Sequence, residues 1–276
     1  MNPSEPIAIP LRMRQLNACV VMPTYNNGGT LQDVVERVLA YCGDVIVVND
    51  GCTDSSSDLL ASFGDRITVV DYGRNRGKGY ALRRGFEKAR EMGFDYALTL
   101  DSDGQHFPED IPVFVDALED CLKAIPNPDK NKGTFPLVNK IMIVGSRNLN
   151  QENMPSGNTF ANKFSNFWFK VQTGINLPDT QTGYRLYSMK SLPCLALLTS
   201  RYEAELELLV FSAWRGVDLI PVKINVFYPK EEERVTHFRP FWDFFRISVL
   251  NTILCIVALF YGWPSILIRK ARRRHE

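Results

Sequence analysis

Short apolar runs alternate with amphipathic stretches along the first half of the chain. Runs of four or five apolar residues are typical of buried strands, and they fall at residues 18–22, 45–48, 67–70, 96–100 and 141–144. The stretches between them, at 31–41, 55–63, 79–92 and 108–122, have the spacing of helices. Thr30 and Asp54 suit the N-caps of the first two, and Pro108 suits the first turn of the fourth. Farther along, we expect a helix over 159–171, a helical run after Glu207 and a strand over 217–228.

This alternation predicts an α/β fold with a mostly parallel central sheet that helices cover on both faces. In such a sheet, ligands bind at the carboxyl ends of the strands. Three polar clusters directly follow predicted strands, at residues 23–26, 49–51 and 101–103. We therefore expect all three clusters at one edge of the sheet.

Residues 247–268 are largely apolar, and roughly 20 such residues are needed to cross a bilayer. Asn251, Thr252 and the sequence Gly262-Trp263-Pro264 interrupt this run, and basic residues lie at both of its ends, which does not fit a single crossing. We expect an amphipathic or re-entrant segment on the membrane surface, with the basic tail 269–274 on anionic lipid. The alternative is a buried C-terminal helix of a soluble domain.

Composition narrows the class of protein. The chain has 276 residues, of which 45% are hydrophobic, and this is enough for one sizeable core. A net charge of +1 gives no reason to expect nucleic-acid binding. The six cysteines are scattered without a Cys-x-x-Cys pair, so we expect neither a zinc site nor a disulfide framework. Because residues 1–17 also lack an apolar leader segment, we place the catalytic part in the cytosol.

Asp101, Asp103 and Gln105 form the most informative cluster. In an extended segment their side chains point to one face, where two carboxylates and an amide oxygen would suit Mg²⁺ or Mn²⁺. Such an ion commonly bridges phosphates. The alternative is an Asp-rich turn that caps the helix starting near Pro108. An EF-hand is excluded, because His106 stands where that motif requires glycine.

Two other polar segments have both a functional and a structural explanation. Residues 49–54 include Asp50, and a carboxylate after a strand often binds a ribose hydroxyl, although a turn with Asp54 as N-cap explains the segment equally well. Residues 73–79 resemble a phosphate loop but do not match a Walker A motif, because the glycine spacing is one residue short. Lys78 and the backbone amides there could meet an anion at the next helix start, or the loop could be a solvated turn.

Together these motifs follow a recognisable order: Pro-Thr-Tyr-Asn, Asn-Asp-Gly, a Gly/Lys/Arg loop, and then Asp-Ser-Asp-Gly-Gln-His. This order, over about residues 17–228, resembles the family 2 inverting glycosyltransferases of the GT-A fold. Within that family it is most similar to the dolichyl-phosphate mannose synthase type, which acts on polyprenyl phosphates.

The resemblance implies a role for each matching residue. A nucleoside diphosphate would be contacted by Pro23, Thr24, Tyr25, Asn27, Asp50, Lys78 and Asp101, although Asn27 stands where many members have Glu and Asn49 replaces the first Asp of Asp-Asp-Gly. Asp101, Asp103 and Gln105 would bind the metal with the diphosphate. The sugar and the acceptor phosphate would be contacted by Arg147, Asp179, Thr182 and Gly183.

A candidate lipid-phosphate contact and the candidate catalytic residues complete the predicted site. Arg239 lies in an aromatic and cationic segment that suits the entry of a lipid phosphate. With Asp103, Glu203 and Glu205 are the candidate catalytic residues; an exposed acidic helix start would explain the glutamates equally well.

The resulting prediction is a metal-dependent, inverting glycosyltransferase at the cytoplasmic face of a membrane. Its catalytic domain would span 17–238 and its membrane-associating tail 239–276. The donor would be a nucleotide-diphosphate sugar and the acceptor a lipid-linked phosphate or another membrane-borne group. A nucleotidyltransferase and a non-catalytic membrane-binding scaffold are the alternatives.

Overall fold

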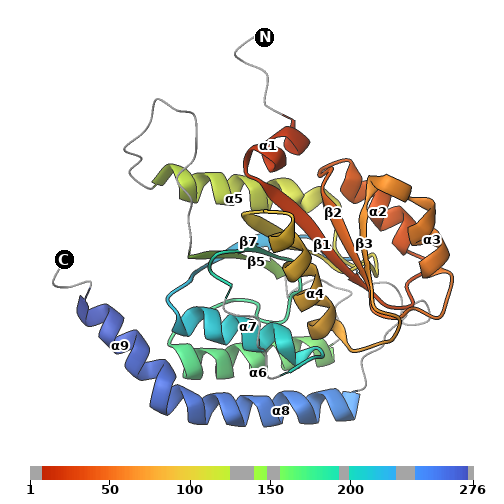
Figure 1. Cartoon of the computed structure of the whole chain (residues 1–276). Coiled ribbons are helices and arrows are strands. Elements are labelled where there is room, and N and C mark those ends of the chain that lie inside the picture. Colours follow the sequence, from red (N-terminus) through yellow and green to blue (C-terminus); the bar gives the residue numbers. More distant parts are fainter. Residues whose placement is uncertain (1–7, 125–139, 148–155, 193–198, 228–239, 273–276) are drawn as a thin grey trace.

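A seven-stranded sheet forms the centre of the computed structural model, which describes residues 8–124, 140–147, 156–192, 199–227 and 240–272 (Figure 1). The strand order is β3-β2-β1-β4-β6-β5-β7, and only β6 runs antiparallel to its neighbours. The strands are β1 Ala18–Thr24, β2 Val45–Asn49, β3 Thr68–Asp71, β4 Tyr96–Thr99, β5 Ile141–Arg147, β6 Arg185–Ser188 and β7 Asp218–Ile224.

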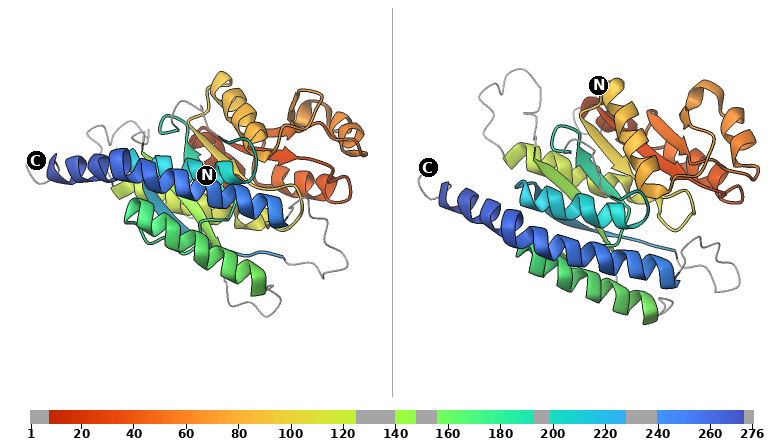
Figure 2. Two further views of the ribbon diagram at one scale, coloured as in Figure 1. Left: turned by 90° about the horizontal axis from the view of Figure 1, so that it is seen from below. Right: turned by 60° about the horizontal axis from the view of Figure 1, so that its bottom comes forward.

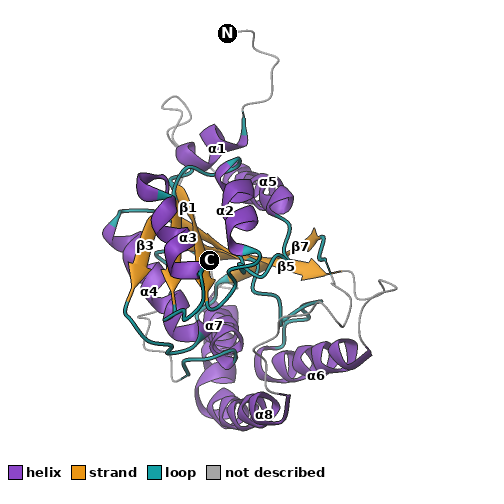
Figure 3. Ribbon diagram, turned by 90° about the vertical axis from the view of Figure 1, so that its right-hand side faces the viewer, coloured by secondary structure: helices purple, strands orange, loops and turns teal. Residues whose placement is uncertain are grey.

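Helices cover both faces of the sheet, as the alternating pattern predicted. One apolar core lies under α1, α2, α3 and α5, and the second lies under α4, α6 and α7 (Figures 1 and 3). Short 3₁₀ turns lie at Gly64–Arg66 and Pro108–Asp110. The helices are α1 Ile9–Gln15, α2 Leu31–Leu39, α3 Ser56–Ser62, α4 Lys78–Glu91, α5 Ile111–Ala124, α6 Ser156–Thr173, α7 Glu203–Trp214, α8 Pro240–Val257 and α9 Trp263–Arg272.

The two predicted N-caps act differently from the expectation. Thr30 precedes α2 but makes no capping bond; its Oγ1 donates to the Ser102 carbonyl at 2.7 Å, which ties the β1–α2 turn to the loop after β4. Asp54 lies one residue before the α3 N-cap, yet its Oδ1 accepts the backbone N–H of Ser56 at 3.0 Å. Asp54 therefore satisfies a donor in the first turn of the helix, as a cap would.

The chain stays helical through Gly262-Trp263-Pro264, the residues that interrupt the apolar run. A π-helical turn at Ala258–Gly262 joins α8 to α9, and this wider turn lies directly before Pro264, which has no N–H to donate back along the helix. Within the described residues, Phe245–Arg272 is the one helix long and apolar enough to cross a membrane, by length and composition alone. Only 28% of its most apolar window is buried, so it is not a core helix.

Candidate functional site

The carboxyl ends of four parallel strands bring the predicted polar clusters together. In the order β3-β2-β1-β4, each strand is parallel to the next, so the residues that follow them share one edge of the sheet. The backbone N–H of Asp50 donates to the Thr24 carbonyl at 2.9 Å, which joins the first two clusters directly. The predicted position of these clusters is confirmed.

The antiparallel strand β6 adds a fourth segment to this edge. Arg185, its first residue, pairs with Thr99 at the end of β4. An antiparallel strand starts where its parallel neighbours end, so residues 179–184 enter the sheet beside Asp101. Sequence patterning missed β6, because its four residues begin with an arginine that is fully buried.

Lys78 lies at the centre of the site. Its Nζ is 2.7 Å from Asp101 Oδ1 and 3.1 Å from Glu205 Oε2, so it links the start of α4, the end of β4 and the start of α7. Burial lowers the pKa of Lys78, but the two carboxylates outweigh burial and hold that pKa above its ordinary value. Burial likewise raises the pKa of Asp101, and the Lys78 charge reverses this, so the net shift is downward.

Gly183 leaves the space that these three side chains occupy. A Cβ built on Gly183 would lie 2.7 Å from Glu205 Oε1, 2.8 Å from Lys78 Nζ and 3.1 Å from Asp101 Oδ2. Real Cβ atoms do not approach polar atoms at the two shorter distances, so any side chain here would push the charged groups apart. Thr182 is buried beside it, and its Oγ1 accepts the backbone N–H of Tyr184 at 3.2 Å.

Asp103 and Gln105 lie next to Asp101 in the loop after β4. Asp103 Oδ1 accepts the Gln105 backbone N–H at 2.9 Å. Burial, and then the charge of Asp101, raise the pKa of Asp103 to about 6. A divalent cation would relieve this repulsion, and two carboxylates with an amide oxygen are a hard donor set, so these residues fit Mg²⁺ or Mn²⁺. No cluster of three or more His, Cys, Asp or Glu suited to a metal occurs in the described ranges, so the donor's phosphates or water would complete the set.

His106 supports this loop from behind. It is 6% exposed, and its Nδ1 accepts the backbone N–H of Asp101 at 3.3 Å. Burial lowers the pKa of His106 to about 4, so the ring is neutral at physiological pH and carries its proton on Nε2. The segment after β7 also holds this loop: Val226 forms an antiparallel β-bridge with His106, and the backbone N–H of Phe227 donates to the Gln105 carbonyl at 2.9 Å.

The carboxylate of Asp50 has an internal role. It accepts hydrogen bonds from Tyr72 Oη at 2.7 Å, Arg76 N at 2.7 Å and Gly77 N at 2.9 Å. The anion that meets the amides of loop 73–77 is therefore Asp50 of the same chain. Gly77 has a φ of +94°, which favours glycine, and this conformation turns the chain into α4 so that Lys78 reaches Asp101.

The β1–α2 turn packs on the loop after β4. Asn27 Nδ2 donates to Ser102 Oγ at 2.8 Å, and Ser102 Oγ donates to the Pro23 carbonyl at 3.1 Å. Thr24 is 2% exposed, and Tyr25 is half-buried beside it. Asn27 thus fixes the position of the Asp101–Asp103 segment, and nucleotide contact by these four turn residues stays a prediction.

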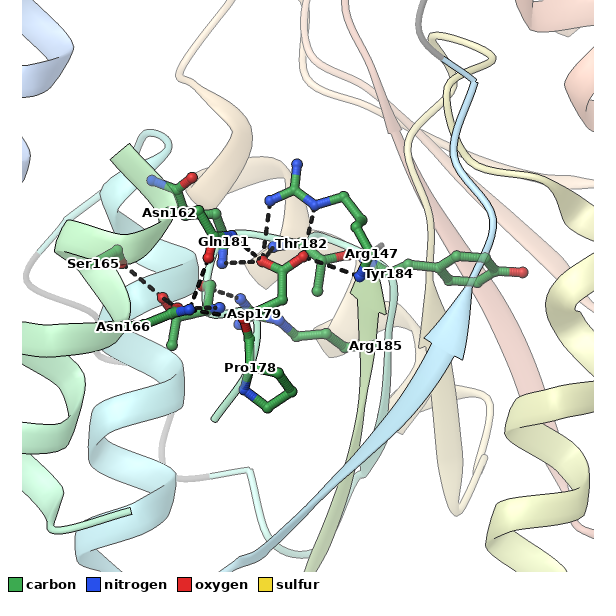
Figure 4. A network of polar contacts seen from close by, with 11 residues as sticks. Arg147, Asn162, Ser165, Asn166, Pro178, Asp179, Gln181, Thr182, Tyr184 and Arg185 are labelled. Atoms are coloured by element: carbon green, nitrogen blue, oxygen red, sulfur yellow. Dashed lines mark hydrogen bonds and ion pairs between the residues drawn. The ribbon is translucent and has the colours of Figure 1, made fainter. Parts of the chain in front are cut away.

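Asp179 forms an ion pair with Arg147, whose side chain is 16% exposed (Figure 4). Arg147 Nε donates to Asp179 Oδ2 at 2.6 Å, and its Nη2 donates to Oδ1 at 3.0 Å. Asp179 is fully buried and also accepts from Asn162 of α6 and from the backbone of Gln181 and Thr182. Burial raises the pKa of Asp179, but its bonds to Arg147 outweigh burial and hold the pKa below its ordinary value. Two of the predicted sugar- and acceptor-binding residues are therefore in direct contact.

The acidic start of α7 is buried, so the alternative of an exposed acidic helix start is wrong. Glu203 and Glu205 are each 7% exposed, and Glu207 is 1% exposed. Glu205 pairs with Lys78, whereas Glu207 accepts two hydrogen bonds from Thr199. Glu203 Oε2 is buried without a hydrogen-bond partner among the residues described. Glu205 and Glu207 thus attach the start of α7 to Lys78 and Thr199, and the rest of the helix packs in the core.

Arg185 is a site residue that sequence reasoning missed. Its Nη1 donates to the Glu205 carbonyl at 2.7 Å and its Nη2 to the Thr180 carbonyl at 2.9 Å. It therefore links α7 to the segment around Asp179, and its charge helps to lower the pKa of Asp101. The sequence signal for Arg185 was its position directly after Gly183-Tyr184, at the end of the candidate sugar-binding segment. Arg239 lies outside the described residues.

The sequence of the chain matches that of a known protein family. Residues 19–195 match the family model described as "Glycosyl transferase family 2". The chain is 26% identical over 232 residues to a UDP-N-acetylglucosamine–dolichyl-phosphate N-acetylglucosaminyltransferase of Methanococcus voltae, covering 76% of this chain and 85% of the relative. It is 24% identical over 226 residues to an undecaprenyl-phosphate mannosyltransferase of Micrococcus luteus, covering 76% and 83%.

Solved structures share the fold. Glucosyl-3-phosphoglycerate synthase of Mycobacterium tuberculosis, in complex with UDP, matches with a TM-score of 0.62 at 18% identity over 94% of this chain and 86% of that one. Its complex with Mn²⁺ and UDP-glucose matches with a TM-score of 0.62 at 18% identity, covering 91% and 81%. The chain thus has the GT-A-like fold that its motif order predicted, and it belongs to glycosyl transferase family 2 as a glycosyltransferase.

Proposed function

We propose that this chain transfers a sugar, with inversion, from a nucleotide-diphosphate donor to a polyprenyl phosphate at the cytoplasmic face of a membrane. The contact of Lys78 with both Asp101 and Glu205 carries the proposal. It brings the candidate diphosphate site, the candidate sugar-side carboxylate and the Gly183 segment to one point. Two relatives are named for dolichyl- or undecaprenyl-phosphate acceptors, which supports the acceptor class.

The donor would lie along the carboxyl edge of β1, β2 and β4. Pro23, Thr24 and Tyr25 would contact the nucleoside, and Lys78 would face the diphosphate. Asp101, Asp103 and Gln105 would hold Mg²⁺ or Mn²⁺. When bound, the cation would neutralise the diphosphate leaving group.

The reaction balances without an external proton acceptor. An acceptor phosphate oxygen forms the new bond to the anomeric carbon while the bond from that carbon to the nucleoside diphosphate breaks on the opposite side. Because the acceptor is already an anion, no side chain needs to deprotonate it. Glu203 and Glu205 would then orient sugar hydroxyls, and Arg147, held by Asp179, would face the acceptor phosphate. With a hydroxyl acceptor, Glu205 would instead act as the base.

Thermal-shift measurements with UDP- and GDP-sugars in Mn²⁺ test the donor and the metal together. A ligand at 100 times its dissociation constant stabilises the fold by about 2.7 kcal/mol, so the correct donor raises the Tm. We expect Asp103→Asn to abolish the part of this shift that requires Mn²⁺, whereas the control Asp65→Asn, an exposed aspartate away from the site, keeps it. Retention of the full shift in Asp103→Asn would overturn the metal assignment.

Product analysis with dolichyl and undecaprenyl phosphate tests the reaction. The proposal requires a glycosylated lipid phosphate and free nucleoside diphosphate in equal amounts. Release of pyrophosphate would instead indicate nucleotidyl transfer. Vesicle binding without turnover under any donor would indicate the membrane scaffold.

A further inference from the structure

The helix from Phe245 to Arg272 exposes apolar side chains along one side and packs on the catalytic domain with the other. Leu250, Leu254 and Ala258 are buried in the second core. Their spacing of four residues marks one stripe of the helix. The opposite stripe is apolar as well, although it is exposed: Phe245, Val249, Ile253, Ile256, Leu259, Phe260, Leu267 and Ile268 are each 42–81% exposed.

Polar contacts fix this helix to the domain along its length. Gln172 Nε2 of α6 donates to Asn251 Oδ1 at 3.0 Å. Trp263 Nε1 donates to the Val171 carbonyl at 3.2 Å, and near the end Arg269 Nη2 donates to the Ala213 carbonyl at 3.4 Å. From residue 251 to residue 269 the helix rises about 27 Å, close to the thickness of the hydrocarbon core of a bilayer. A crossing in this packed form would draw α6 into the bilayer with the helix, which the exposed Lys163 and Lys170 of α6 oppose.

Helix α6 extends the apolar face sideways. Phe167 is 58% exposed and Val171 is 42% exposed, one turn apart on one side of α6. Lys163 and Lys170 are exposed on that same side by helical spacing. Seen from below, α6 and the C-terminal helix lie side by side (Figure 2).

The charge on this face has one sign. Residues 156–173 and 245–272 contain no Asp or Glu. Exposed basic residues on the C-terminal helix are Arg246, Lys270 and Arg272. Apolar side chains interspersed with Lys and Arg are the pattern of segments that lie in the interface of anionic bilayers. A second copy of this chain would oppose the same basic face and gain no charge complementarity.

We infer that α6 and the Phe245–Arg272 helix together form an in-plane, monotopic contact with an anionic bilayer, and that the helix does not cross it. The inference rests on the proposed function only in that the acceptor is membrane-borne. It also orients the site. Asn162 and Asn166 on the inner side of α6 contact Asp179 and Thr180, while Phe167 lies on the outer side. A single helix, about 10 Å thick, therefore separates the lipid face from the Arg147–Asp179 pair.

Vesicle partitioning of the full chain tests the face. With vesicles of phosphatidylcholine and phosphatidylglycerol, Phe167→Glu and Phe260→Glu should each lower the partition coefficient at least about tenfold, because each removes an exposed aromatic ring that would enter the bilayer and adds a charge. Leu11→Glu, which changes an exposed leucine of α1, is the matched control and should bind as wild type does. Vesicles of phosphatidylcholine alone should bind wild type about tenfold more weakly.

Protease access to a C-terminal tag on sealed vesicles tests the orientation. An in-plane helix leaves the tag on the same side as the catalytic domain, so external protease removes it. Protection of the tag would overturn the inference in favour of a crossing helix. In the partitioning assay, weaker binding by Phe260→Glu but not by Phe167→Glu would mean that α6 does not contact the bilayer. Unchanged vesicle binding by both variants, or self-association without vesicle binding, would overturn it altogether. Donor-induced thermal shifts of the Phe167→Glu and Phe260→Glu variants, measured without vesicles, show separately whether the proposed nucleotide-sugar site is intact.

Discussion

The ion pair between Arg147 and Asp179 allows a quantitative prediction about the stability of the fold. Asp179→Asn keeps the shape of the side chain and one acceptor oxygen but removes the charge that Arg147 faces at 2.6 Å and 3.0 Å. Breaking a buried ion pair by neutralising one partner costs about 3–5 kcal/mol. For a chain of this size, each kcal/mol lowers the Tm by about 2 °C, so Asp179→Asn should lower it by about 6–10 °C.

Asp179→Ala should cost more, since it also removes the acceptor for Asn162 Nδ2 and for the backbone N–H groups of Gln181 and Thr182. Combining Asp179→Asn with Arg147→Met should recover part of the loss, because no unpaired charge then stays buried. Urea unfolding followed by tryptophan fluorescence gives these free energies. The full cost should appear above about pH 4 and shrink below it, because wild-type Asp179 also becomes protonated as the pH falls through its lowered pKa.

An exposed ion pair with the same two-point geometry is the matched control. Arg37 donates from Nε and Nη2 to Glu109 at 3.0 Å and 2.6 Å, but 30% of the Arg37 side chain and 47% of the Glu109 side chain are accessible to solvent. Glu109→Gln should therefore cost less than about 1 kcal/mol. Equal costs for Glu109→Gln and Asp179→Asn would refute the reasoning, because burial would then not set the strength of the Arg147–Asp179 pair.

Three further predictions concern the site and the tail. Gly183→Ala should lower kcat/KM at least about tenfold, because the added Cβ would displace Lys78. The control Gly43→Ala, whose added Cβ would meet nothing within 4 Å, should have the activity of wild type. Equal activity of the two variants would contradict the contacts assigned to Gly183. NMR titration should show His106 neutral down to about pH 4, and a midpoint near 6.5 would mean that the ring is exposed. Asn251→Leu should change the free energy of unfolding, measured in urea, by no more than about 1–2 kcal/mol, because Gln172 loses one hydrogen bond while the apolar contacts of α8 remain. A larger loss would mean that this polar contact is the main attachment of α8.

Strands β1, β2, β4 and most of β5 were predictable because they are buried on both faces and therefore appear as continuous apolar runs. Strand β6 gave no such signal. Arg185 is tolerated there because its guanidinium donates hydrogen bonds to the carbonyls of Glu205 and Thr180. Only the tertiary fold brings these two partners close to it. The motif order located the polar edge, yet it could not distinguish Asp50 as a ligand contact from Asp50 as the anchor of loop 73–77. Both uses need a carboxylate after a strand; the positions of Tyr72 and Gly77 establish the anchor, and nucleotide contact by Asp50 stays a prediction.

Lys78 has a consequence for the order in which ligands assemble. In the resting protein its ammonium group already serves as the counterion of Asp101, at 2.7 Å. A divalent cation that arrives alone must compete with this tethered charge, so it gains less than it would from two unpaired carboxylates. A cation that arrives with a nucleoside diphosphate meets no such competition, because the diphosphate offers Lys78 a new partner. Metal and nucleotide should therefore bind synergistically, each raising the affinity for the other by the same factor.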